Sequence, residues 1–205
     1  MNLLHITDLH VCCTETDSPV ARLNYISYIE NLKKHINKDI YALVLTGDIF
    51  NQANLVEKEN QTLARDIIKS LGEILGIPIP NIFVCPGEHD FMRAPKENLL
   101  YYDSVKFRNF IKGNFIIDNE FNGALDYVNE RKEDGTIFLM LDSIYRNYNE
   151  NERNARHRKI IDDIEGRING SDFTNLIIGS HYPATIDLIT DTLVKNSLHA
   201  DTRSN

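Results

Sequence analysis

The stretch from Leu3 to His10, Leu-Leu-His-Ile-Thr-Asp-Leu-His, places an aspartate and a histidine directly after a short apolar run. Three further segments repeat this arrangement. They are Ala42 to Leu45 followed by Gly47-Asp48, Ile82 to Val84 followed by Gly87-Glu88-His89-Asp90, and Leu176 to Ile178 followed by Ser180-His181. Continuous apolar runs of this kind, alternating with helical patterns, predict strands of a sheet that is buried on both faces. Because ligands of open α/β sheets bind outside the carboxyl ends of the strands, we expect these side chains to face one crevice.

Periodicity and helix-ending residues predict the other elements of an α/β fold. Pro19 at a first turn indicates a helix start, Gly76 and Pro78 indicate a helix end, and Asp134-Gly135 is typical of a turn between strands. We expect helices at 18–37, 56–75, 95–111, 152–168 and 186–194, and strands at 2–7, 41–45, 82–85, 115–118, 125–129, 136–142 and 176–179. Aromatic side chains of the third helix should be partly buried.

Composition bounds the class of protein. The 205 residues fit one domain, or one domain with a small appendage. The net charge of −8 disfavours long nucleic acid bound on a broad basic face, although bound cations could supply positive charge locally. The three cysteines, Cys12, Cys13 and Cys85, indicate no disulfide framework. Without a signal peptide or a run of roughly 18 apolar residues, we expect a cytoplasmic protein that does not enter a membrane.

The polar residues at the strand ends suit metal chemistry. Asp8 and His10 lie two positions apart, so an extended chain would point both side chains the same way. Asp48 has two carboxylate oxygens and could bridge cations roughly 3.5–4 Å apart, while His181 adds an imidazole. His89 could donate a proton to a leaving oxygen, with the neighbouring carboxylate of Asp90 holding its tautomer.

The four segments, in this order and spacing, resemble the calcineurin-like metallophosphoesterases, whose motifs are Asp-x-His, Gly-Asp, Gly-Asn-His-Asp and a histidine after an apolar strand. The resemblance covers nearly the whole chain and implies a two-sheet β-sandwich flanked by helices. It implies two divalent ions, Mn²⁺ before Fe, Zn or Ni, and hydrolysis of a phosphate mono- or diester by a metal-activated water. By position, the metal ligands would be Asp8, His10, Asp48, Glu88 and His181, and the catalytic residues would be His89 and Asp90.

Two departures from the family pattern leave alternatives open. Glu88 stands where the family has Asn, so it is either a variant ligand or a change that impairs the site. The family's last motif, Gly-His-x-His, does not occur in the chain, and the histidine that follows His181, His199, has no such context. Either the chain is the N-terminal part of a longer protein with further domains, or its site is depleted.

Several functions therefore remain in competition. The first is a phosphoesterase whose substrate is a nucleotide, a phosphoprotein, or a nucleic acid bound only at the metal site. The second is a catalytically impaired module with a binding or regulatory role, and a third is an effector domain active only within a larger protein. Isolated polar residues have plainer interpretations: His5 is structural, His35 and His157 are solvated, and Cys12 and Cys13 belong to a loop. Asn51 and Arg93 are hypothetical pocket residues.

Overall fold

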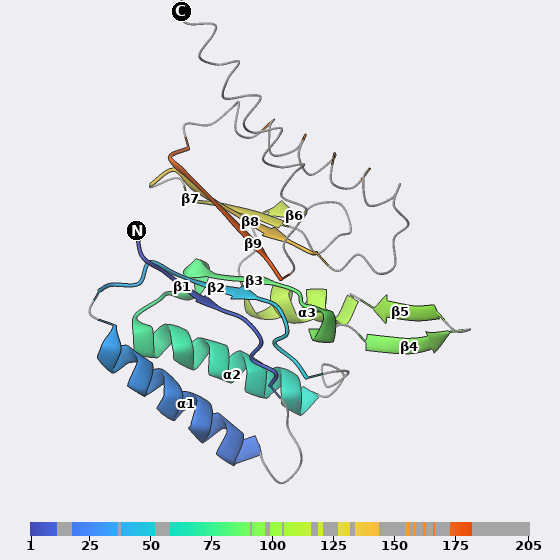
Figure 1. The fold of residues 1–205 in the computed structure, drawn as a ribbon, viewed down its shortest axis with the longest axis horizontal. Helices are drawn as coiled ribbons and strands as arrows, with labels where there is room; N and C mark the ends of the chain where they lie inside the picture. Colours follow the sequence, from blue (N-terminus) through green and yellow to red (C-terminus); the bar gives the residue numbers. More distant parts are fainter. Residues whose placement is uncertain are drawn as a thin grey trace, which may run out of the picture.

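A computed structural model shows the fold as a sandwich of two sheets with helices on one outer face (Figure 1). The structure describes residues 1–11, 18–36, 38–51, 58–90, 92–96, 99–103, 105–115, 119–120, 127–131, 134–143 and 173–181, with single positions between 155 and 166. The expectations for Cys12, Cys13, His157, His199 and the helix at 186–194 lie outside these residues, as does nearly all of that at 152–168.

The first sheet is formed by three parallel strands in the order β1-β2-β3, which are Leu3–Ile6, Ala42–Thr46 and Ile82–Cys85. Helix α1 (Ser18–His35) follows β1, and helix α2 (Lys58–Leu75) follows β2. Both helices cover the same face of this sheet (Figure 1). Because all three strands run parallel, their carboxyl ends, and the loops that follow them, meet at one edge.

Helix α2 shows how the sequence fixes this part of the fold. Its buried side chains recur every three or four residues, which turns one apolar face to the sheet; they are Leu63, Ala64, Ile67, Ile68 and Leu71. Gly76 then adopts a positive φ of 73°, and the N–H of Ile77 returns to the carbonyl of Gly72 at 2.7 Å. Glycine enters this left-handed region without a side-chain clash, so the predicted helix end is confirmed.

The second sheet has four strands in the order β6-β7-β8-β9. They are Asn119–Glu120, Tyr127–Arg131, Thr136–Leu141 and Asn175–Ser180. Strands β8 and β9 are parallel, whereas the other pairs are antiparallel. The turn before β8 is the predicted one, since Gly135 has a φ of 64° and the Asp134 carboxylate accepts the N–H of Thr136 at 3.0 Å.

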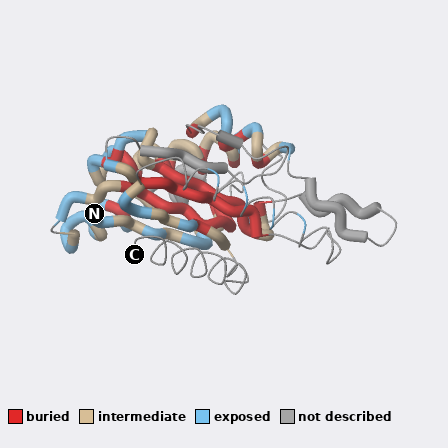
Figure 2. The backbone as a smooth tube through the Cα atoms, turned by 90° about the horizontal axis from the view of Figure 1, so that it is seen from above, coloured by how far each residue is buried: buried red, intermediate tan, exposed pale blue. Residues whose placement is uncertain are grey.

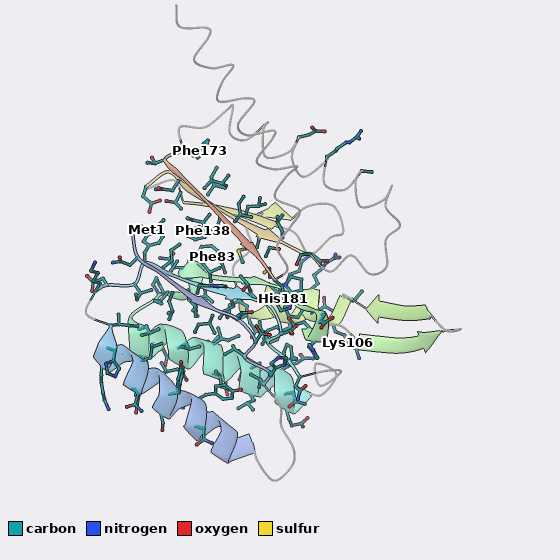
Figure 3. The ribbon with its side chains drawn as sticks, in the orientation of Figure 1. Met1, Phe83, Lys106, Phe138, Phe173 and His181 are labelled. Carbon is teal, nitrogen blue, oxygen red and sulfur yellow. The ribbon has the colours of Figure 1, made fainter. Side chains whose placement is uncertain are left out.

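A small apolar core joins the two sheets. The rings of Phe83 on β3 and Phe138 on β8 are stacked, with centroids 3.7 Å apart (Figure 3). The ring of Tyr41 is nearly parallel to that of Phe138, with centroids 6.4 Å apart. Ala42, Val44, Cys85 and Met140 complete the buried set. A larger core lies on the opposite face of the first sheet, beneath the helices, and the tube in Figure 2 shows buried residues concentrated through these layers. The expected two-sheet sandwich is confirmed.

The predicted helix at 95–111 is wrong in its first half. Residues Met92–Lys96 and Leu99–Asp103 form strands β4 and β5, an antiparallel hairpin in which Pro95 pairs with Leu100. Pro95 suits a helix start, but proline is equally compatible with an extended strand, and the following Leu-Leu-Tyr-Tyr run suits a strand. Helix α3 occupies Val105–Asn114, and its Phe107 and Phe110 are buried as expected.

None of the helices in the described part of the chain is long and apolar enough to cross a bilayer. Of the cysteines, Cys85 is described; it is buried between the sheets and forms no disulfide within the described part of the chain.

Candidate metal centre

The loops after β1 and β2 run side by side and are joined by main-chain hydrogen bonds. The N–H groups of Asp8, His10 and Val11 donate to the carbonyls of residues 47, 48 and 49 at 3.1, 2.9 and 2.7 Å. Three residues that are not glycine adopt positive φ here: Asp8 at 59°, His10 at 45° and Asp48 at 51°. Such conformations cost about 1–3 kcal/mol each and persist only where the surroundings enforce them. The predicted ligands Asp8, His10 and Asp48 therefore all lie on strained backbone at the strand ends.

The loop after β3 approaches this pair through two glycines. A Cβ at Gly47 would lie 2.5 Å from the Cα of Gly87, and a Cβ at Gly87 would overlap the backbone N and carboxylate of Asp48. Gly47 also needs its φ of 86°. Only glycine at both positions allows the backbones to come this close, so the two Gly residues of the motifs bring the loops after β2 and β3 together.

Asp48 lies at the centre of the predicted ligand set and is buried. Its Oδ1 accepts the backbone N–H of His89 at 2.9 Å. Its Oδ2 lies 3.6 Å from His181 Nε2, 3.8 Å from His89 Nε2 and 3.9 Å from His10 Nε2. The structure thus brings three imidazoles from three different loops to one carboxylate oxygen.

These distances fit a shared cation better than direct hydrogen bonds. They exceed the hydrogen-bonding range, whereas two ligand atoms each about 2.1 Å from one ion lie roughly 3.0–4.2 Å apart, depending on the angle at the ion. Ligand atoms of Asp8, Asp48 and His181 all lie within 4.8 Å of one another. Carboxylate and imidazole donors suit Mn, Fe, Zn or Ni, so the residues fit a divalent metal centre. Oδ1 of Asp48 accepts a backbone N–H, and Oδ2 is the oxygen that the three imidazoles approach.

His181 joins the centre from the second sheet, at the end of β9 (Figure 3). Its Nδ1 is 2.8 Å from the carbonyl oxygen of Thr46, to which it donates. This hydrogen bond fixes the tautomer in which Nε2 carries the lone pair, and Nε2 faces Asp48. An imidazole held in this way is oriented for metal binding before any ion arrives.

The predicted ligand Glu88 and the predicted acid His89 lie in a short 3₁₀ helix, Glu88–Asp90, directly after β3. Glu88 Oε1 is 3.7 Å from His89 Nε2. The rings of His10 and His89 meet edge to face with centroids 5.0 Å apart. The structure thus places Glu88 and His89 beside the ligands from β1 and β2, and their roles in metal binding and proton transfer remain predictions.

Asp90 differs from its expected placement behind the His89 ring. Its two oxygens accept the backbone N–H groups of Gly87 and Phe50, at 2.8 and 2.9 Å, and the side chain is fully buried. Within the described part of the chain, the buried Nδ1 of His89 has no hydrogen-bond partner. Burial raises the pKa of Asp90 from 3.8 to about 7, although the Gly87 and Phe50 amides oppose the shift. Asp90 therefore fastens the β3 loop to the β2 loop rather than orienting an imidazole.

Sequence reasoning missed two residues that support the predicted ligands. The carbonyl of Thr46 holds His181, the hydroxyl of Thr46 lies 2.6 Å from His5 Nε2, and the hydroxyl of Thr7 bonds to Asp8. Thr7 could have been found as the polar neighbour of a predicted ligand, but nothing in the sequence pairs Thr46 with a histidine 135 positions away.

The remaining hypothetical pocket residues gain little support. Asn51 is exposed, and its backbone N–H donates to Val11. The side chain of Arg93 lies outside the described residues. His35 is exposed, as expected for a solvated histidine.

A two-sheet α/β sandwich with carboxylates and imidazoles gathered at its strand ends is typical of metal-dependent phosphoesterases. Comparison with known families agrees: residues 1–200 match the family described as calcineurin-like phosphoesterase. The chain belongs to this family, as the resemblance of its four motifs implied.

A curated relative is the uncharacterized metallophosphoesterase-like protein YydB of Bacillus subtilis (strain 168). It is 30% identical over 109 residues, which make up 53% of this chain and 21% of that protein. The matched segment therefore spans about a fifth of the relative's length.

Proposed function

We propose that this chain binds two divalent cations, Mn²⁺ before Fe, Zn or Ni, and hydrolyses phosphate mono- or diesters. The observation that carries the proposal is the convergence of the His10, His89 and His181 imidazoles on Oδ2 of Asp48. Carboxylates and imidazoles that face one another beyond hydrogen-bonding distance suit a cation between them. Membership of the calcineurin-like phosphoesterase family supports the same chemistry.

Each residue has a defined part in this proposal. Asp8 and His10 would hold one ion, His181 and Glu88 would hold the other, and Asp48 would be a ligand of both. When bound, the ions supply an activated water and neutralise charge that develops on the phosphoryl group. His89, whose Nε2 lies 3.8 Å from Asp48 Oδ2, would donate a proton or hydrogen bond to the leaving oxygen. Asp90 acts indirectly, because it holds the loop that carries Glu88 and His89.

The substrate class follows from charge. A chain with a net charge of −8 repels an extended polyanion, so small phosphoesters, or a nucleic acid held only at the ions, are favoured. Glu88 does not distinguish these substrates, since an ionised carboxylate cannot donate a hydrogen bond to the phosphate of either, as the usual Asn would. Three cysteines with no disulfide pattern favour a reducing compartment, the cytoplasm.

A second candidate function is a phosphoesterase-fold module with a binding or regulatory role, or an effector domain that works within a larger protein. The observation in its favour is the ligand set itself: Glu88 replaces Asn, and Gly-His-x-His does not occur in these 205 residues. Each imidazole absent from a metal site lowers affinity for the ion. This candidate predicts weaker or incomplete occupancy by metal.

Metal stoichiometry separates the two candidates. The metal-free chain is equilibrated with Mn²⁺, dialysed and analysed for bound metal, and its hydrolysis of a chromogenic phosphodiester and phosphomonoester is then measured. We expect close to two ions per chain together with turnover. Zero or one ion and no hydrolysis would favour the binding module.

Asp48→Asn tests the central ligand in the same assays. The amide keeps the shape but lowers the affinity of the central oxygen for cations, so metal content and turnover should fall together, by about 100-fold or more in rate. Asp39→Asn is the matched control, because Asp39 is exposed and precedes β2, at the opposite end of the strand. Full turnover in Asp48→Asn would show that the central assignment is wrong.

A further inference from the structure

Thr7 lies between the end of β1 and the predicted ligand Asp8, and its hydroxyl has two acceptors within reach. Thr7 Oγ1 is 2.6 Å from Asp8 Oδ2 and 3.2 Å from the carbonyl oxygen of Thr46. A hydroxyl has one proton to donate, and a separation of 2.6 Å is typical of an O–H bond to an ionised carboxylate. The proton therefore points to Oδ2 of Asp8.

This hydrogen bond makes the two oxygens of Asp8 unequal. Oδ2 is held by Thr7, whereas Oδ1 lies 3.6 Å from His10 Nε2 and faces the centre. The Asp8 side chain is 49% exposed, so without this bond it could turn freely into solvent. Thr7 thus restricts a mobile carboxylate to the orientation in which Oδ1 points inward.

The two oxygens of Asp48 are also unequal, but a backbone N–H rather than a side-chain hydroxyl holds one of them. Its Oδ1 is held by the backbone N–H of His89, and its Oδ2 faces the imidazoles. Asp48 is also 5% exposed, so packing and the main chain fix it. Asp8 lacks that packing, and the structure shows a side-chain hydroxyl in the equivalent place.

Thr7 and His181 also contact the same atom, the carbonyl oxygen of Thr46. The Thr46 carbonyl that accepts Nδ1–H of His181 lies 3.2 Å from Thr7 Oγ1. One main-chain carbonyl at the end of β2 therefore contacts both the Thr7 hydroxyl, which holds Asp8, and the His181 ring. Asp8 and His181 are two of the three grouped candidate ligands. A shift of Thr7 would alter the spacing between a ligand of the first sheet and the ligand of the second.

We infer that Thr7 is a positioning residue of the metal centre, whose hydroxyl makes Asp8 a one-oxygen ligand through Oδ1. The inference rests on the proposed function, because it requires that Asp8 bind a cation. It concerns the affinity and arrangement of the site and assigns Thr7 no contact with substrate.

Mn²⁺ titration of the full, metal-free chain by calorimetry tests the inference. Thr7→Val keeps the branched shape and removes the hydroxyl, so Mn²⁺ should bind about 10- to 100-fold more weakly. Thr7→Ser restores the hydroxyl and should return the affinity to within about threefold of the parent protein. Thr174→Val is the matched control, since Thr174 is exposed and precedes β9 at the end away from the site.

The unfolding temperature of each metal-free variant separates positioning from folding. A positioning role predicts that Thr7→Val unfolds close to the parent temperature without metal and loses only its Mn²⁺ affinity. Equal affinity in Thr7→Val and the parent, or no recovery in Thr7→Ser, would overturn the inference. Should Thr7→Val fail to fold, Thr7→Ala offers the same comparison with Thr7→Ser.

Asp8→Asn distinguishes a failure of this inference from a failure of the proposed function. If Asp8→Asn loses Mn²⁺ affinity and Thr7→Val does not, the role of Thr7 alone is wrong. If Asp8→Asn binds Mn²⁺ as the parent does, Asp8 is not a ligand, and both the proposed centre and the role of Thr7 are overturned.

Discussion

The two sheets contribute to the candidate centre in different ways. The first sheet supplies Asp8, His10, Asp48, Glu88 and His89 from three adjacent parallel strands, whose loops are joined by main-chain hydrogen bonds and by contact between two glycines. Among the described residues, the second sheet supplies His181, from the end of β9. Its link to the first sheet is the hydrogen bond from His181 to Thr46, backed by stacked aromatic rings.

This difference indicates that the two halves of the site respond to different perturbations. Ligands of the first sheet are placed by backbone geometry local to the loops. The ligand of the second sheet is placed by the distance between the sheets, which side-chain packing sets. A change in one kind of support should therefore alter one set of ligands more than the other, and three variants test this.

Gly87→Ala should have the largest effect. The new methyl would overlap the backbone N and Oδ1 of Asp48, so the loops after β2 and β3 must separate. We expect a loss of Mn²⁺ affinity of about 100-fold and a loss of about 1–3 kcal/mol in the free energy of unfolding. Titration calorimetry and urea unfolding measure the two quantities.

Gly113→Ala is the matched control for this variant. Gly113 lies in α3 with open space around it, where alanine should add about 0.5–1 kcal/mol of stability and leave Mn²⁺ binding unchanged. Normal Mn²⁺ affinity in Gly87→Ala would show that close contact between the loops is not what forms the site.

Phe138→Leu should have an intermediate effect, confined to the ligand of the second sheet. Loss of the ring stacked on Phe83 should lower the free energy of unfolding by about 1–2 kcal/mol and loosen the position of His181. Phe115→Leu makes the same chemical change in the core beneath the helices.

The two leucine variants should be similarly destabilised, but only Phe138→Leu should bind Mn²⁺ more weakly, by about 10-fold, as expected when one ligand is misplaced. Equal Mn²⁺ affinities at equal stability would show that packing between the sheets does not position His181. Calorimetry at about 10–15 °C below the lower unfolding temperature keeps both variants folded, because 1 kcal/mol shifts that temperature by about 2–4 °C in a chain of this size.

The last prediction concerns Asp90 and pH in the metal-free protein. Because burial raises the pKa of Asp90 to about 7, the folded protein holds a proton that the unfolded chain releases near pH 3.8. The resulting stabilisation is complete below that lower value and is lost as the pH rises towards 7. Asp90→Asn cannot ionise, so its free energy of unfolding should fall less steeply than that of the parent over this range.

Urea unfolding with EDTA at several pH values measures the slope, and Asp39→Asn serves as an exposed carboxylate control. Parallel curves for Asp90→Asn and the parent would contradict the raised pKa. The amide introduced by Asp90→Asn would also turn its NH₂ group towards one backbone N–H, so the variant should be less stable than the parent at every pH.

Local sequence was sufficient for much of this fold. Strands β1, β2 and β3 and helix α2 follow from apolar runs and from residues such as Gly76 that end helices. The β4–β5 hairpin was missed because Pro95 fits both a helix start and an extended strand, and pairing with residues 99–103 decided between them. The choice depended on hydrogen bonds to another segment, which periodicity within one segment does not report.

The sequence by itself determined the family, the strands β1, β2 and β3, and the residue types at their carboxyl ends, because each depends on near neighbours along the chain. Tertiary structure decided which oxygen of Asp8 and Asp48 faces the centre, that Asp90 binds main-chain amides, and that Thr46 orients His181. These features are contacts between loops that are distant in sequence. They exist only once backbone hydrogen bonds and packing between the sheets have fixed the loops within a few ångströms of one another.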